Sequence, residues 1–142
     1  MVKKIFLSFL LLFCLTSTVS AQTHKQVEIF DIEQERVVKK VPVTPDIREE
    51  VKQLIERTTS VYPKIKPIPN KGFMIKVPLH PAVHIQNQWL RGKVDQVILI
   101  FPPNEHPFYL VMDKRHRPHL FNIEGETDTL LEMLDYEPEA SE

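Results

Sequence analysis

Three apolar stretches near the end of the chain, joined by connections of only five residues, place the tightest limit on the fold. The stretches are VDQVILIF (Val94–Phe101), PFYLVMD (Pro107–Asp113) and HLFNI (His119–Ile123), and the connections are PPNEH and KRHRP. A crossover between parallel strands needs a dozen or more residues, so strands joined this closely pair antiparallel. Residues Val97–Ile100 present no polar face, which predicts that the first of these strands is covered on both sides.

Two segments upstream predict a β-hairpin. Apolar and polar residues alternate in QVEIFDIE (Gln26–Glu33), and the run RVVKKVPV (Arg36–Val43) follows after two residues. Pro42 has no N–H to donate to a sheet, so we expect the second strand to end there or to lie at an edge.

The segment TPDIREEVKQLIERTTS predicts an amphipathic helix. Thr44 suits the N-cap and Pro45 the first helical position, and acidic residues follow in the first turn. Apolar residues recur at spacings of three and four: Ile47, Val51, Leu54 and Ile55. We expect this stripe to lie on a sheet.

The segment between this helix and the apolar stretches is less regular. FMIKVPL alternates, and HPAVHIQNQWL fits either a further strand or an irregular segment. TDTLLEMLDY predicts a short C-terminal helix. Strands grouped after a helix favour an α+β fold, in which an N-terminal hairpin and one amphipathic helix pack on a mainly antiparallel sheet. Cystatin-like folds have a similar plan, by analogy.

The N-terminus has the three parts of a secretory signal. Lys3 and Lys4 precede the apolar run Ile5–Leu15, and Val19-Ser20-Ala21 matches a cleavage pattern of small residues. We therefore expect a signal peptide over residues 1–21 with cleavage after Ala21, one α+β domain over 22–136, and an acidic flexible tail over 137–142. The protein is then secreted or associated with the cell wall, and only an uncleaved signal would hold it at a membrane.

Composition narrows the chemistry of the mature chain. Cys14 is the only cysteine and lies within the predicted signal, which leaves no disulfide and no thiol nucleophile. The 18 basic residues include Lys3 and Lys4, so 16 remain against 19 acidic residues, a net charge of about −3. That balance argues against a nucleic acid partner.

Catalytic and metal signatures are missing, although histidine is abundant. The six histidines are His24, His80, His84, His106, His116 and His119. His116 and His119 have the spacing of helical metal ligands, but Pro118 between them opposes a helix. The sequence has no nucleophile elbow, no HExxH and no glycine-rich phosphate loop. We predict no metal, no cofactor and no catalytic residue, and consider a non-enzymatic role the better hypothesis.

Two stretches suit binding. In HIQNQWLRGK, the single tryptophan, Trp89, stands beside Arg91, although the sequence favours a core position for Trp89 on the face of Val83 and Ile85. In DKRHRPH, Lys114 begins a basic cluster that continues with Arg115, His116 and Arg117. The cluster suits an anionic polymer, or keeps a solvated turn soluble.

The signal peptide and the stretches VEIFDIE, NQWL and VILIFPP resemble small exported proteins of Bacillus-type Gram-positive bacteria that have no assigned activity. The resemblance implies export and no catalytic residue. Our leading hypothesis is a secreted or cell-envelope domain that binds an envelope protein or an anionic wall polymer. The alternatives are a hydrolase that uses a metal or the histidines, and an inhibitor or regulator of another secreted protein.

Overall fold

The computed structural model describes residues 26–63 and 68–138. The predicted signal peptide and the last four residues of the predicted tail lie outside that range. The described elements, in chain order, are β1 (Gln26–Asp31), β2 (Arg36–Pro42), α2 (Pro45–Glu56), β3 (Phe73–Gln86), β4 (Arg91–Phe101), β5 (Phe108–Met112), β6 (Pro118–Asn122) and α3 (Asp128–Met133).

The predicted α+β class is confirmed. The six strands form one sheet in the order β2-β1-β3-β4-β5-β6, and every neighbouring pair is antiparallel. The N-terminal hairpin is β1 and β2, and β2 ends at Pro42 as expected from its missing N–H. The strands β4, β5 and β6 follow one another as the short connections required.

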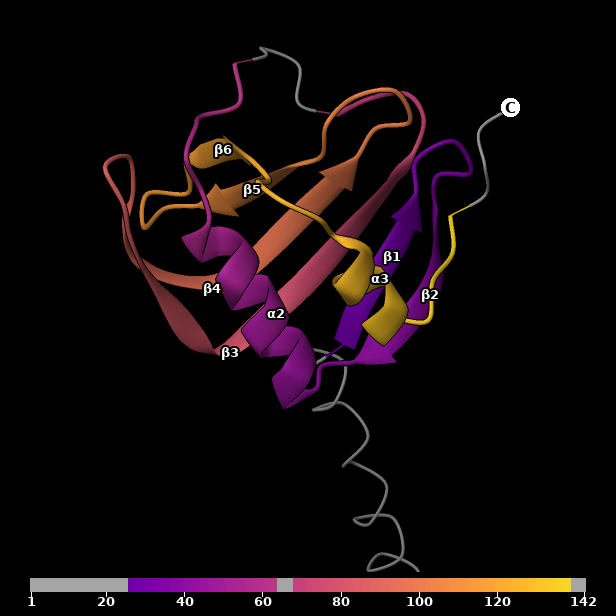
Figure 1. Cartoon of the computed structure of the whole chain (residues 1–142), viewed down its shortest axis with the longest axis horizontal. Coiled ribbons are helices and arrows are strands. Elements are labelled where there is room, and N and C mark those ends of the chain that lie inside the picture. Colours follow the sequence, from indigo (N-terminus) through magenta and orange to yellow (C-terminus); the bar gives the residue numbers. More distant parts are fainter. Residues whose placement is uncertain (1–25, 64–67, 139–142) are drawn as a thin grey trace, which may run out of the picture.

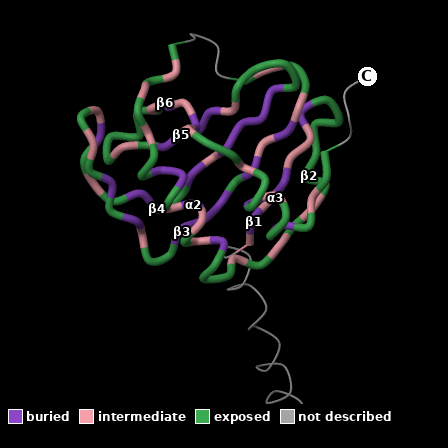
Figure 2. The backbone as a smooth tube through the Cα atoms, viewed as in Figure 1, coloured by how far each residue is buried: buried purple, intermediate pink, exposed green. Residues whose placement is uncertain are grey.

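Both described helices lie on the same face of the sheet (Figure 1). Helix α2 begins as predicted, because the Thr44 hydroxyl oxygen accepts a hydrogen bond from the Ile47 N–H at 3.2 Å. Its apolar stripe is buried against the sheet and joins Leu130 and Leu134 from the C-terminal region in one core. Buried residues follow the strands and the inner side of α2, whereas the turns are exposed (Figure 2).

The strand β3 corrects the division of FMIKVPL and HPAVHIQNQWL into two segments. It runs through FMIKVPL and continues to Gln86, with an irregularity in its pairing to β4 between Pro78 and Val83 that contains the cis His80–Pro81 bond. The Arg48 guanidinium of α2 donates to the Pro81 carbonyl at 2.8 Å. Three extra residues are therefore accommodated in β3, where Arg48 contacts them, without ending the strand.

The outer face of β4 is only partly covered. Val97 and Leu99 face the helices and are fully buried, and Ile100 on the opposite face is also buried. Gln96 is exposed and Ile98 is half-buried on that opposite face, so the prediction of cover on both sides holds for part of the strand.

The two edges of the sheet differ. Residues 60–62 run along the outer edge of β6, where the Tyr62 N–H donates to the Leu120 carbonyl and the Asn122 N–H donates to the Ser60 carbonyl. Among the described residues, no strand pairs with the outer edge of β2.

Candidate functional site: a basic pocket between two turns

A pocket of about 390 Å³ lies where the β3–β4 and β5–β6 turns meet at one end of the sheet. Both turns leave strands at this end because β3, β4, β5 and β6 are adjacent and antiparallel. Its walls are Trp89, Leu90, Arg91, Asp113, Lys114, Arg115, Arg117 and His119. The volume is within the range of small-ligand sites.

The β3–β4 turn owes its shape to Asn87. The side-chain carbonyl of Asn87 accepts hydrogen bonds from the backbone N–H groups of Trp89 at 2.9 Å and Leu90 at 2.7 Å. The Asn87 N–H also donates to the Leu90 carbonyl at 3.0 Å. Asparagine stabilises tight turns in this way, and the turn places Trp89 and Arg91 on either side of Leu90.

Trp89 combines the two roles that its sequence context allowed. Its ring is half-buried, packs against the core and lies 5.9 Å from the Phe121 ring, centroid to centroid. It also forms part of the pocket wall. The ring is thus held rigidly by the core while part of it faces the pocket, as in many binding sites that use tryptophan.

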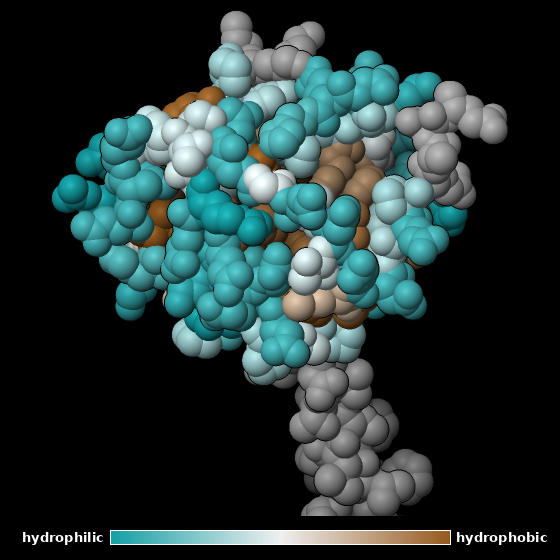
Figure 3. Space-filling model, in the orientation of Figure 1, coloured by the Kyte–Doolittle hydropathy of each residue, from teal (hydrophilic) through white to brown (hydrophobic). Residues whose placement is uncertain are grey.

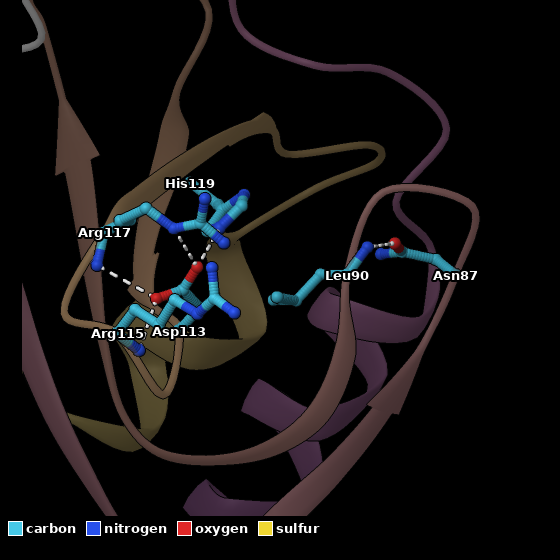
Figure 4. A network of polar contacts seen from close by, with 6 residues as sticks. All are labelled: Asn87, Leu90, Asp113, Arg115, Arg117 and His119. Carbon is cyan, nitrogen blue, oxygen red and sulfur yellow. Dashed lines mark hydrogen bonds and ion pairs between the residues drawn. The ribbon is translucent and has the colours of Figure 1, made fainter.

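The β5–β6 turn is organised by the carboxylate of Asp113 (Figure 4). Its Oδ1 accepts from the backbone N–H groups of Arg115 at 2.8 Å and Arg117 at 3.0 Å. Its Oδ2 accepts from the Arg117 Nε at 2.9 Å and the His119 Nε2 at 3.0 Å. Four donors converge on one carboxylate, which fixes the turn while its basic side chains stay exposed.

These hydrogen bonds determine the ionisation of Asp113. The bond from His119 holds the pKa of the Asp113 carboxyl well below its ordinary value, and the backbone N–H groups of Arg117 and Arg115 lower it further. The carboxylate is therefore charged throughout the neutral range and neutralises the neighbouring Arg117.

The pocket keeps a surplus of positive charge. Arg91, Lys114, Arg115 and Arg117 contribute four cations, and Asp113 contributes one anion, which leaves about three positive charges without counting His119. The side chains of Arg91, Lys114 and Arg115 are exposed and form no hydrogen bond or ion pair with another described residue. Figure 4 shows Arg115 extending from its turn toward Leu90 on the facing turn. Such an arrangement attracts an anion.

Four of the five predicted binding residues line this pocket: Trp89, Arg91, Arg115 and Arg117. His116 does not line it and is exposed at the tip of the turn, with a positive φ of 58°. Leu90 and His119 belong to the pocket, although sequence reasoning did not select them for binding. Leu90 carries no local signal, because only the meeting of the two turns gives it this position.

The histidines do not form a metal site in the described part of the chain. No group of three or more potential metal ligands occurs there. The His106 ring contacts the Ile123 carbonyl at 2.5 Å, and His106 lies at the opposite end of β5 from Asp113. The pocket walls contain no hydroxyl or thiol group. Within residues 26–63 and 68–138, no helix has the length and hydrophobicity to span a bilayer.

Comparison with known proteins gave no match to a family model, to a curated protein or to a solved structure.

Proposed function

We propose that this protein is a non-enzymatic binding domain that acts outside the cytoplasm and holds acidic groups of an anionic polymer in its basic pocket. The observation that carries the proposal is the convergence of Arg91, Lys114 and Arg115 around one hollow, with no described partner for their charges. Guanidinium groups bind phosphate and carboxylate in a bidentate manner, which is the chemistry an acidic polymer offers.

The neutral wall of the pocket supports a role in binding. Trp89 and Leu90 provide an apolar side against which the backbone or a sugar ring of a polymer packs, and the tryptophan ring is anchored by Phe121. A repeated acidic polymer presents many such groups, so modest affinity for each group is multiplied along its length. Export, as the N-terminal sequence predicts, gives the protein access to polymers of this type.

Trp89 provides a direct assay, because it is the only tryptophan of the chain. We expect its fluorescence to change when the purified protein is titrated with polyphosphate, with a weaker response to polyglutamate and none to neutral dextran. Replacement of two cations, Arg91→Gln with Arg115→Gln, is expected to weaken binding of polyphosphate about tenfold. Raising the salt concentration is also expected to weaken binding of polyphosphate.

Two controls separate the pocket from total charge. Lys40→Gln with Lys52→Gln removes the same charge outside the pocket and should leave binding within a factor of two of the wild type. His116→Gly should also bind normally, because His116 lies outside the pocket walls. Equal losses of affinity in the pocket variant and the Lys40/Lys52 control would reduce the interaction to nonspecific attraction and contradict the proposal.

A further inference from the structure

A second and larger hollow lies at the opposite end of the sheet. It has a volume of about 690 Å³ and is bounded by the β1–β2 turn, the start of β3, the end of β4 and the C-terminal residues after α3. In Figure 3 apolar residues are visible through an otherwise hydrophilic surface over this part of the helix-bearing face. We refer to this hollow as the aromatic groove.

Three aromatic rings form the base of the groove. Phe73 and Phe101 stack with their centroids 4.6 Å apart and their planes 7° from parallel. Tyr136 meets Phe73 edge to face at 5.1 Å. Phe73 and Phe101 are buried in the core and Tyr136 is half-buried, so the rings are held in place. The faces of aromatic rings carry partial negative charge, which attracts cations.

The close approach of two strands shapes the base. Gly72 has a φ of 98°, and a Cβ atom at this position would lie 2.1 Å from the Phe101 carbonyl oxygen. Only glycine permits this contact. The Gly72 carbonyl in turn accepts a hydrogen bond from the Ile32 N–H at 3.0 Å, which ties the β1–β2 turn to the same point. The backbone contacts at Gly72 therefore fix the shape of the groove.

The rim of the groove is acidic. Asp31, Glu33 and Glu137 line it together with one cation, Lys71. Asp31 is engaged within its own turn, where it accepts from the Gln34 N–H at 2.8 Å. Glu33 and Glu137 are exposed and pair with no described residue. Three carboxylates against one ammonium leave about two negative charges around an aromatic base.

The charge and the shape of the aromatic groove together determine which kind of ligand it can bind. A bare metal ion does not fit, because the described residues contain no cluster of potential ligands and the base is aromatic. An anion would be repelled by the rim. We infer that the aromatic groove binds a cationic and apolar segment of a polypeptide partner, in which lysine or arginine side chains alternate with apolar ones. The apolar side chains pack on Phe73, Phe101 and Tyr136, and the cations meet Glu33 and Glu137.

The inference is independent of the proposed function, because the two sites share no residue. The test is an NMR titration of the ¹⁵N-labelled protein with a blocked peptide of alternating lysine and leucine. We expect the backbone signals of Gly72 and Phe73 to shift in a saturable way, while those of Lys114 and Arg115 stay in place. Peptides of alternating glutamate and leucine, or of lysine and glycine, should produce much smaller shifts.

Substitutions at the rim define the contribution of charge. Glu33→Gln and Glu137→Gln should each weaken binding of the lysine–leucine peptide about threefold, and together about tenfold. Glu49→Gln, on the exposed side of α2, makes the same charge change outside the groove and should have no effect. All three positions are exposed, so the folded state is expected to persist in every variant, which the dispersion of the NMR spectrum verifies.

Three results would overturn the inference. One is the absence of shifts at Gly72 and Phe73 with the lysine–leucine peptide. Another is equal affinity of the wild type and the Glu33/Glu137 double variant. The third is a shift of the groove signals with protein concentration alone, because a second copy of this chain would then be the occupant.

Discussion

The basic pocket and the aromatic groove lie at opposite ends of the same strands and differ in nearly every respect. Arg91 at the start of β4 lines the pocket, and Phe101 at its end lines the groove, ten residues away. An extended strand of that length covers about 33 Å. The pocket is built from the side chains of two turns, whereas the groove is built by close packing of strands and the C-terminal segment. A small fold can thus carry opposite charges at its two ends, because a separation of about 33 Å is several Debye lengths at physiological ionic strength.

Substitution of the glycines near these two ends, Gly72 and Gly92, is expected to give the largest difference in the free energy of unfolding. Gly72→Ala places a methyl group 2.1 Å from the Phe101 carbonyl oxygen in a backbone conformation with positive φ, and should lower the free energy of unfolding by about 3 kcal/mol. Gly92→Ala, beside Arg91, also has a positive φ but no described neighbour within 4 Å of its Cβ, so we expect a loss of about 1 kcal/mol. Chemical denaturation measures both. Equal losses would contradict the tight contact at the groove.

Ionisation of Tyr109 is expected to weaken the core in alkali. Burial raises the pKa of Tyr109 to about 12, against a smaller lowering effect of its hydrogen bond with Thr58. The folded state therefore holds the phenolic proton more tightly than the unfolded chain. Stability from this group is complete below pH 10 and is lost as the pH rises toward 12, by about 2 kcal/mol.

Tyr109→Phe isolates this contribution. The variant should lose less stability than the wild type between about pH 10 and pH 12, because phenylalanine has no proton to release. Denaturation at several alkaline pH values measures the difference. Parallel stability curves for the wild type and Tyr109→Phe would show that Tyr109 is not the group responsible.

Acid should destabilise the β5–β6 turn at the basic end, by less than the changes predicted above for the glycines and Tyr109. The pKa of Asp113 is depressed, so its stabilisation is present above the ordinary carboxyl pKa and is lost as the pH falls through the depressed value. Asp113→Asn presents an amide N–H₂ to the Arg117 and His119 donors and should be less stable at neutral pH. The difference between wild type and variant should shrink as the pH falls below about 4. A difference that stays constant in acid would exclude this role for the carboxylate.

The sequence predicted the elements better than their assembly. Alternation and short connections were sufficient for the antiparallel strands, and Thr44 and Pro45 marked the start of α2, because these signals are local. The continuity of β3 across His80–Pro81 was not predictable, since it depends on support from Arg48 of a different element.

The basic pocket and the aromatic groove also differ in how well the sequence predicted them. Trp89, Arg91 and the basic cluster stood out by residue type, so most of the pocket was identified in advance. The groove was not, because Asp31, Lys71, Phe101 and Tyr136 come from four distant segments. None of those segments has an unusual composition, and they are brought together by the register of the strands and the packing of the C-terminal segment.

The unequal edges of the sheet bear on how the protein behaves when concentrated. The β6 edge is covered by residues 60–62, whereas β2 has two exposed valines, Val37 and Val38, next to Lys39 and Lys40. Lysines and a terminal proline discourage another chain from adding to such an edge. The Lys39 ammonium also donates to the Asp135 carbonyl. We expect acetylation of both lysines to favour association of further copies of the chain through β2.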